Sequence, residues 1–152
     1  MNNNTTSARR YQTTAYDGNE LTVKTLSSAD KLALDPQAYD LYYSLPDGIL
    51  AFRDSAGNWV EYRGHWPKFG LKCISILQAL LLNPGDFLSP AAIGELTGHD
   101  SLCENTVLAA RVHAMRKSLR DPGARFIETR TSNGYAIRWP RERSFLWVEL
   151  AL

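Results

Sequence analysis

The segment LKCISILQALLLNPG, Leu71–Gly85, constrains the fold more than any other part of the sequence, because nearly all of its side chains are apolar. A helix that is apolar all round cannot face water on any side, so it has to lie inside a core. Asn83, Pro84 and Gly85 are expected to end this helix. The rest of the chain must therefore cover it, and we expect the Cys73 thiol to be buried.

A second helix is predicted directly after the first, in FLSPAAIGELTG, Phe87–Gly98. Ser89 can cap its start, with a proline in the first turn, and Gly98 can end it. Ile93 and Leu96 are expected to face inward. The result is a helix pair, followed by the short polar connection HDSLCE.

The third predicted helix, NTVLAARVHAMRKSL at Asn105–Leu119, has an apolar stripe opposite a polar, basic face. The stripe repeats at the spacing of one helix face, through Leu108, Val112, Met115 and Leu119. The opposite face holds Thr106, Ala110, His113, Ala114 and Lys117, while Arg111 and Arg116 flank the stripe. One side of this helix therefore belongs to a core, and the other is left for solvent or a partner.

The segment RFIETRTSNGYAIRWP, Arg125–Pro140, predicts a hairpin over residues 126–139. Its two strands are joined by Asn133-Gly134, and Asn-Gly is a strong signal for a tight hairpin turn. Tyr135, Ile137 and Trp139 alternate along the second strand, so we expect them to hold the hairpin to the core.

The residues before the first helix predict a β-rich part. GILAFRDSAGNWVEYRG, Gly48–Gly64, is expected to form two strands around the turn Ala56-Gly57-Asn58. ELTVKTL, Glu20–Leu26, is expected to form one strand. DPQAYDLYYSL, Asp35–Leu45, predicts a short helix, because Asp35 can cap it and a proline suits its first turn. This helix either packs on the main domain or offers a surface to a dimer or another partner.

The two ends of the chain differ in character. Residues 1–15 are polar and almost free of aliphatic side chains, which predicts a disordered tail. RERSFLWVELAL, Arg141–Leu152, is too apolar for a free tail. It either returns as an extra strand on the N-terminal sheet or covers a partner protomer.

Basic residues are concentrated late in the chain. The formal net charge is only +1, yet residues 105–143 hold nine Lys or Arg against three Asp or Glu. Because phosphates are neutralised locally, such a concentration is typical of a nucleic-acid face. A solvated basic surface without a partner is the alternative.

The order of the elements, a helix pair, a basic third helix and then a hairpin, is the layout of helix-turn-helix DNA readers. Cations on the third helix can reach phosphates and guanine edges, and the small Ala110 and Ala114 allow contact with thymine methyls. The hairpin would be a wing that lies along the DNA backbone or enters the minor groove.

Residues 46–140 resemble the OmpR/PhoB-type winged-helix effector domain family. FGLKCISILQALLLNPGDFLSPAAI is similar to the family's first helix, Asn-Pro-Gly turn and serine-capped second helix. VHAMRKSL is similar to the end of its recognition helix, and FIETRTSNGYAI to its wing. The resemblance implies an α+β fold with an N-terminal antiparallel sheet, a three-helix core and a C-terminal hairpin wing. It also implies transcriptional regulation through double-stranded DNA, with tandem or paired protomers.

The resemblance also implies which positions contact DNA. These are Thr106, Arg111, His113, Ala114, Arg116 and, in the wing, Thr131 with its neighbour Arg130. Ala110 and Lys117 join this set through their place on the same helix face. Ala114 and Thr131 stand where the family has arginines, and Ser132 stands where it has glycine, so base readout is expected to differ here.

These patterns divide the chain into a disordered tail (1–15), an extension with a strand and a short helix (16–45), a winged-helix DNA-binding domain (46–140) and an apolar strand or tail (141–152). We predict a cytoplasmic, sequence-specific transcription regulator that binds double-stranded DNA, with RNA polymerase and a second copy as further candidate partners. The alternative is a winged-helix interaction module that binds RNA polymerase or another regulator. The sequence has no catalytic motif, phosphate loop or metal-ligand spacing, so neither enzyme activity nor a cofactor or metal is expected. No apolar run approaches the roughly 20 residues of a membrane helix, so no membrane partner is expected.

Overall fold

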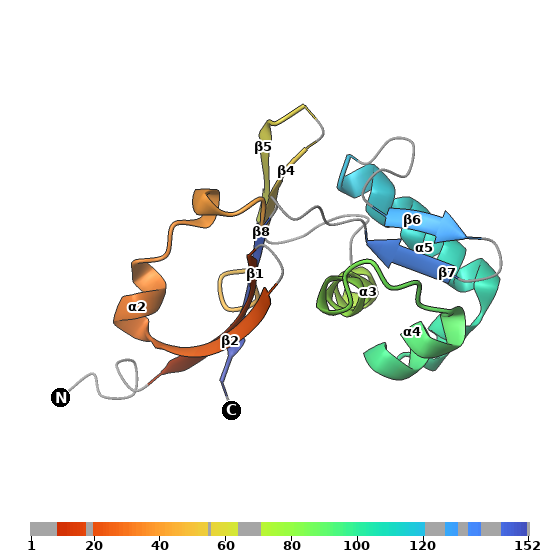
Figure 1. Cartoon of the computed structure of the whole chain (residues 1–152), viewed down its shortest axis with the longest axis horizontal. Coiled ribbons are helices and arrows are strands. Elements are labelled where there is room, and N and C mark those ends of the chain that lie inside the picture. Colours follow the sequence, from red (N-terminus) through yellow and green to blue (C-terminus); the bar gives the residue numbers. More distant parts are fainter. Residues whose placement is uncertain are drawn as a thin grey trace. The chain divides into compact units, whose positions relative to one another are not determined.

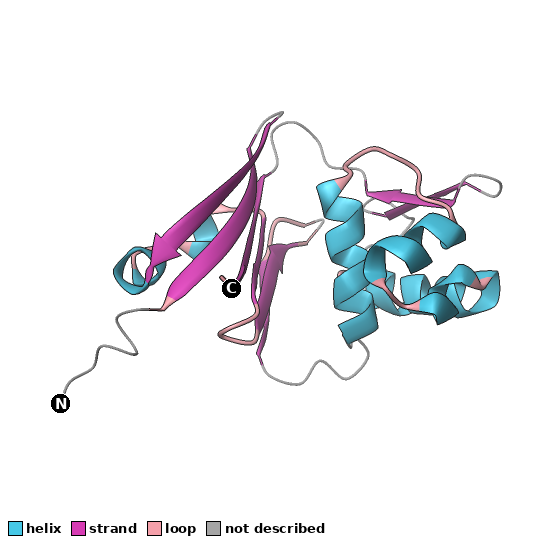
Figure 2. Ribbon diagram, turned by 90° about the horizontal axis from the view of Figure 1, so that it is seen from below, coloured by secondary structure: helices cyan, strands magenta, loops and turns pink. Residues whose placement is uncertain are grey.

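The computed structural model describes residues 9–17, 20–54, 56–63, 71–120, 127–130, 134–137 and 144–151. Contacts between residues divide the chain into two compact units. Unit 1 consists of Met1–His65 and Pro140–Leu152, and unit 2 consists of Trp66–Trp139. The protein is a mixed α+β chain in which unit 2 is inserted, in sequence, between two parts of unit 1 (Figures 1 and 2). No helix in the described ranges is long and apolar enough to cross a membrane.

Unit 1 is built on a six-stranded sheet in the order β2-β1-β8-β3-β4-β5. Its strands are β1 (Arg10–Asp17), β2 (Glu20–Ser27), β3 (Leu41–Ser44), β4 (Ile49–Arg53), β5 (Trp59–Arg63) and β8 (Ser144–Leu150). Neighbouring strands are antiparallel, except that β3 and β8 run parallel. The sheet is therefore mixed, whereas the family resemblance implied an antiparallel one.

The apolar segment at the C-terminus supplies β8, which lies in the middle of this sheet. Residues 145–148 are all buried, and since successive side chains point to opposite faces, the strand is buried on both. Trp147 packs on Tyr43 of β3, with 4.2 Å between ring centroids, and Phe145 stacks on Tyr16 of β1 at 5.9 Å. Aromatic pairs of this kind contribute about 0.5–1.5 kcal/mol beyond the area they bury.

The predicted helix over Asp35–Leu45 is wrong. Asp35 does act as a cap, because its carboxylate accepts a hydrogen bond from the Gln37 amide at 3.1 Å, but only the short 3-10 helix η1 (Pro36–Ala38) follows. Leu41–Ser44 then forms β3, in which every side chain is buried. The prediction failed because a run of four buried residues has neither the alternation of a half-buried strand nor the spacing of one helix face, so a buried strand and a buried helix look alike in the sequence.

The predicted boundaries of the N-terminal parts also change. A domain that starts at residue 46 would separate β3 from β4, although every residue of β3 pairs with a residue of β4. The prediction of disorder for residues 1–15 is wrong from residue 10 onward, because β1 pairs with both β2 and β8. Residues 1–8 lie outside the described residues. Backbone pairing on both sides of β1 orders a segment whose composition alone is that of a tail.

The segment between β2 and β3 covers part of one face of the sheet. It holds α2 (Ser28–Leu32), whose start is fixed by a capping box between Ser27 and Asp30, and η1. Leu34 and Tyr39 from this segment pack against a buried cluster from the sheet, Tyr11, Tyr42, Leu146 and Val148.

The described residues of unit 2 form three α-helices, one 3-10 helix and a two-stranded sheet. The elements are α3 (Leu71–Leu82), α4 (Pro90–Thr97), the 3-10 helix η2 (Asp100–Cys103), α5 (Asn105–Ser118), β6 (Ile127–Arg130) and β7 (Gly134–Ile137). The three helices lie where the sequence predicts them. Apolar side chains from all three are fully buried, among them Cys73, Ile76, Leu77, Leu80, Ile93, Leu108 and Met115.

Helix α4 corrects one sequence prediction. Ser89 caps it, its hydroxyl accepting from the Ala92 amide at 3.1 Å, and Gly98 ends it in the left-handed conformation. However, Leu96 is 58% exposed and does not face inward. The buried face of α4 is centred on Ile93 and Gly94, since a Cβ on Gly94 would stand 2.3 Å from the Cys103 sulfur of η2. Leu96 lies well off that face.

Substitution of Trp147 tests the central role of β8. Trp147→Ala should lower the free energy of unfolding by about 3–5 kcal/mol, the usual cost of removing a large buried aromatic side chain. Leu150→Ala, at the half-exposed end of the same strand, should cost less than about 1 kcal/mol. Urea denaturation monitored by circular dichroism measures both, and equal effects would contradict the central packing of β8.

Asp47, in the turn between β3 and β4, is held by two donors. Its Oδ2 atom accepts hydrogen bonds from Lys31 Nζ at 2.5 Å and from Ser44 Oγ at 2.9 Å. Burial alone would raise the pKa of Asp47, but these hydrogen bonds and the attraction of Lys31 and Arg63 outweigh it. The pKa of Asp47 in the folded protein is therefore below its ordinary value.

This lowered pKa predicts a pH dependence of stability. Ionised Asp47 stabilises the fold above its unfolded-state pKa of about 4, and the stabilisation is lost as pH falls through the lower folded-state pKa. Asp47→Asn should therefore be less stable than the wild type near neutral pH, and the difference should shrink as the solution is acidified below about pH 4. Urea denaturation of both proteins across pH provides the comparison, and a difference that stays constant would contradict this role.

Candidate nucleic-acid interface on helix α5

Helix α5 buries one face and exposes the other, as the sequence predicts. The buried side chains are Leu108, Val112, Met115 and, just after the helix, Leu119. The predicted contact residues Thr106, Ala110, Arg111, His113 and Lys117 are exposed, and Ala114 is half-buried. The apolar stripe thus fixes which side of α5 remains open, because its burial leaves the helix a single orientation.

The open face of α5 carries positive charge, from Arg111 and Lys117, that no described residue neutralises. Within the described ranges, the side chains of Arg111, His113 and Lys117 make no hydrogen bond or ion pair. The backbone beneath them is fixed, since the Arg111 carbonyl oxygen accepts a hydrogen bond from the buried Cys73 thiol of α3 at 3.8 Å. Arg111 and Lys117 thus project from a helix that packs on the core, and no described residue binds their side chains.

Small side chains create a shallow hollow on the same face. Its volume is about 430 Å³, and it is lined by Thr106, Val107, Ala110, Arg111 and Ala114. Ala110 and Ala114 lie one turn apart, so a flat ligand edge could approach the helix backbone there. The surface combines close access with a cation at its border.

Arg116 occupies a different position from the other cations of α5. Its guanidinium donates two hydrogen bonds to the Ile127 carbonyl oxygen, at 3.1 and 2.7 Å, and one to the Thr129 hydroxyl. These donors fasten strand β6 to the helix. The base-reading role implied for Arg116 by the family resemblance thus competes with a structural role inside unit 2.

Backbone contacts attach the other strand of the hairpin to the turn before α4. Leu88 and Tyr135 exchange hydrogen bonds at 2.7 and 3.0 Å, and the Gly85 amide donates to the Ile137 carbonyl oxygen at 3.0 Å. Gly134 makes this approach possible, because its φ is +97° and a Cβ would lie 2.0 Å from the Leu88 carbonyl oxygen. The hairpin is therefore held from both sides, by α5 and by residues 85–88.

The predicted contact residues of the hairpin are divided between described and undescribed parts. The Arg130 guanidinium lies over the Phe87 ring, 4.3 Å from its centroid, and the residue is exposed. Thr131, together with the hairpin turn at 131–133 and Trp139, lies outside the described residues. Ile137 is fully buried and Tyr135 half-buried, but Ala136 between them is buried as well, so burial along this strand does not alternate as predicted.

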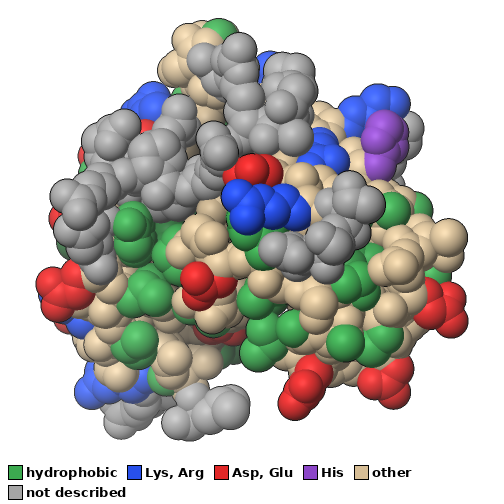
Figure 3. Space-filling view, turned by 45° about the vertical axis from the view of Figure 1, so that its right-hand side comes forward, with side chains coloured by type: hydrophobic (Ala, Val, Ile, Leu, Met, Phe, Trp, Pro, Cys, Tyr) green, Lys and Arg blue, Asp and Glu red, His purple; other side chains and the backbone are tan. Residues whose placement is uncertain are grey.

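Charged side chains on one face of the molecule are partly segregated (Figure 3). A histidine lies beside Lys or Arg side chains at the upper right, and Asp and Glu side chains lie along the lower right edge. In the sequence, exposed acids precede α5, at Glu95, Asp100 and Glu104, whereas the last turn of α5 carries Arg116 and Lys117. Positive charge at the C-terminal end of a helix is also favoured by the helix dipole.

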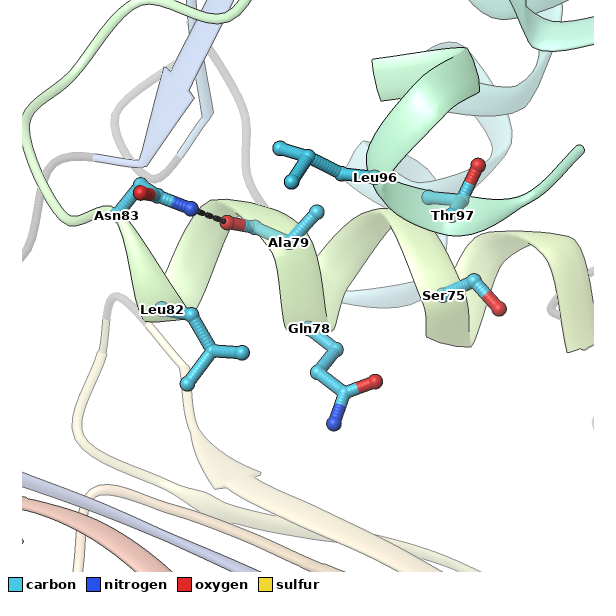
Figure 4. Close-up of a pocket in the computed structure, with 7 residues that line it drawn as sticks. All are labelled: Ser75, Gln78, Ala79, Leu82, Asn83, Leu96 and Thr97. Carbon is cyan, nitrogen blue, oxygen red and sulfur yellow. Dashed lines mark hydrogen bonds between the residues drawn. The ribbon is translucent and has the colours of Figure 1, made fainter. Parts of the chain in front are cut away.

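A second hollow, between α3 and α4, lacks the features of a reactive site (Figure 4). Its volume is about 140 Å³, and its lining residues are Ser75, Gln78, Ala79, Leu82, Asn83, Leu96 and Thr97. None of these is titratable, and the Asn83 side chain donates to the Ala79 carbonyl oxygen at 2.8 Å. Because no acid, base or nucleophile pair converges there, α5 is the stronger candidate.

Comparison with known proteins yields one structural likeness. No family model matches the chain, and no curated protein matches its sequence. The chain is similar to a solved structure described as a lantibiotic response regulator, the C-terminal domain of the nisin resistance regulator NsrR. The two are 24% identical, the likeness covers 66% of this chain and 94% of the other, and the TM-score is 0.47.

The interaction of Arg116 with the hairpin can be tested without DNA. Arg116→Lys keeps the positive charge but cannot donate to both acceptors in the same geometry, because lysine lacks the planar fork. We expect a loss of about 1–3 kcal/mol in the free energy of unfolding, the range for hydrogen bonds from charged groups. Hydrogen exchange at β6 should accelerate as well.

Lys117→Arg, one position along the helix, is the matched control and should leave stability unchanged within about 0.5 kcal/mol. If Arg116→Lys were as stable as the wild type, the guanidinium would not be what holds β6.

Proposed function

We propose that the protein is a transcription regulator that binds double-stranded DNA through α5. Unit 2 would act as a winged helix-turn-helix, with α4 and α5 as the helix pair and β6–β7 as the wing. Helix α5 enters the major groove, which is wide enough to admit one helix. The wing lies along the DNA backbone or enters the minor groove beside it.

One observation supports this proposal above all others. His113 and Lys117 lie on the face of α5 opposite the buried stripe and Arg111 lies at its flank, all three exposed and with no side-chain partner in the described ranges. Arg111 also borders the hollow that the small side chains of Ala110 and Ala114 leave open. A polyanion with a flat, accessible edge has the complementary charge and shape.

The residues divide into two kinds of contact. Lys117 and Arg111 suit phosphate oxygens, because a long cation can reach the backbone while the helix axis lies in the groove. Ala110 and Ala114 suit the floor of the groove, where small apolar side chains contact thymine methyls. Such base contacts would make binding sequence-specific, and phosphate contacts would make it depend on salt.

Charge reversal on α5 tests the proposal. Binding of a fluorescent mixed-sequence duplex should be measured by anisotropy at several salt concentrations. Arg111→Glu and Lys117→Glu should each weaken binding by about tenfold or more at low salt, because each removes one phosphate contact and adds repulsion. Each should also make the slope of log K against log salt shallower by about 0.9.

Arg10→Glu is the matched control, since it makes the same charge change on an exposed residue of unit 1. It should leave binding nearly unchanged. Selection from a randomised duplex library should enrich one motif, which the double variant Arg111→Glu/Lys117→Glu loses. Absence of duplex binding at low salt, together with binding of purified RNA polymerase by the same protein, would instead support the interaction-module alternative.

A further inference from the structure

Strand β2 is an outermost strand of the unit 1 sheet and has an open edge (Figure 1). It pairs with β1 along all eight of its residues, and no described residue pairs with its other side. Every residue from Glu20 to Thr25 is exposed. An open edge of this length presents a row of backbone donors and acceptors on which another strand can pair.

The two faces of β2 carry different side chains. Leu21 and Val23 share one face and are 39% and 63% exposed, although both are apolar. Glu20 and Lys24 share the other face with Thr22, because side chains alternate along a strand. Glu20 and Lys24 are too far apart to pair with each other, at about 13 Å for four residues of extended chain.

We propose that β2 joins two copies of this protein, edge to edge and antiparallel, with Thr22 on the two-fold axis. The occupant of the open edge is thus the same strand of a second copy. A two-fold interface of this kind is closed, so it produces a dimer and not a fibre.

Backbone geometry restricts the possible alignments of two β2 strands. In a β-strand, the N–H and C=O groups of every second residue point toward one edge. When two strands pair antiparallel, residues whose groups point toward the shared edge must lie opposite each other. For two identical strands, this requires the two-fold axis to pass through a residue and not between two residues. The choice is therefore among axes at successive residues of β2.

Side-chain chemistry selects one of these axes. With Thr22 on the axis, Glu20 of each copy lies opposite Lys24 of the other, and Leu21 lies opposite Val23. With Val23 on the axis, Lys24 would lie opposite Thr22 and Leu21 opposite Thr25. Only the Thr22 alignment forms two opposite-charge pairs and one continuous apolar row.

A like-charge contact within the chain also favours this arrangement. Glu20 lies directly opposite Asp17 in the β1–β2 pair, and like charges in that position repel each other. In the described ranges, neither Glu20 nor Lys24 has an ion-pair partner. Lys24 of a second copy would lie beside Glu20 and reduce this repulsion.

The pairing is expected to be weak. Five residues on each side bury much less than the roughly 800 Å² per partner of a stable interface. Self-association should therefore be measured by sedimentation velocity up to high concentration, about 500 µM, in the absence of DNA. Because the sample contains no DNA, the outcome does not depend on the function proposed for α5.

Charge variants of the full chain test the alignment. Glu20→Lys and Lys24→Glu should each weaken self-association by about tenfold or more, because each places like charges opposite each other twice. An equimolar mixture of the two variants should associate again, since every facing pair is then opposite in sign. The double variant Glu20→Lys/Lys24→Glu should also associate as the wild type does. Lys117→Glu, with the same charge change on α5, is the control and should have no effect.

A disulfide test locates the axis. In a Cys103→Ser background, which removes the exposed thiol, Thr22→Cys should form a cross-linked dimer on mild oxidation. Facing Cβ atoms in an antiparallel pair are about 4.5–5.5 Å apart, close to disulfide geometry. Thr25→Cys, also exposed on β2, should cross-link much more slowly.

A protein that stays monomeric at every concentration would overturn the proposal. Self-association that the charge variants leave unchanged, or that cross-links equally through Thr25→Cys, would overturn it as well.

Discussion

The position of β8 in the middle of the unit 1 sheet is the constraint on which the rest of the structure depends. Strands β1 and β3 do not pair with each other, and each pairs with β8 instead. Strands β1 and β3 therefore cannot form one sheet until β8 pairs with both of them. Unit 2 lies between β3 and β8 in the sequence. Pairing of strands this far apart in the sequence costs loop-closure entropy, and the burial of residues 145–148 on both faces of the sheet has to offset that cost.

Sequence patterns predicted the parts of the fold whose signals are local. The stripe through Leu108, Val112 and Met115 defined α5, and Ser89 and Gly98 marked the ends of α4, because periodicity and capping depend on neighbouring residues. The failures have the opposite origin. The cap at Asp35 was recognised, but the chain leaves helical geometry after one turn because β4 and β8 recruit Leu41–Ser44 into the sheet. Likewise, β1 has the composition of a tail and is ordered by strands on both sides of it.

The candidate site shows the same division. The open face of α5 followed from the apolar stripe alone, so the exposure of Ala110, Arg111 and Lys117 was predictable. The separate role of Arg116 was not, since its acceptors are a carbonyl oxygen and a hydroxyl eleven and thirteen positions further along the chain. Gly134 was recognised only as a turn residue. Its further importance, the close approach of Leu88, depends on a contact between segments that no local pattern reveals.

Positively charged side chains serve in two distinct ways in this protein. Where cations are partly buried, they hold the fold together, as Lys31 does with Asp47 and Arg116 does with β6. On α5 and on β2, cations are exposed and have no partner in the described ranges, so they remain available to attract a negatively charged ligand. An exposed ion pair adds little to stability, so losing one costs the fold little and leaves the charge for binding. The two proposed interfaces follow from this distinction. On α5, Arg111 borders a hollow over small side chains, which suits a groove in DNA. On β2, Glu20 and Lys24 lie along an open strand edge, which suits an identical strand. Because these surfaces belong to different units, a change in one can be made without a direct change in the other.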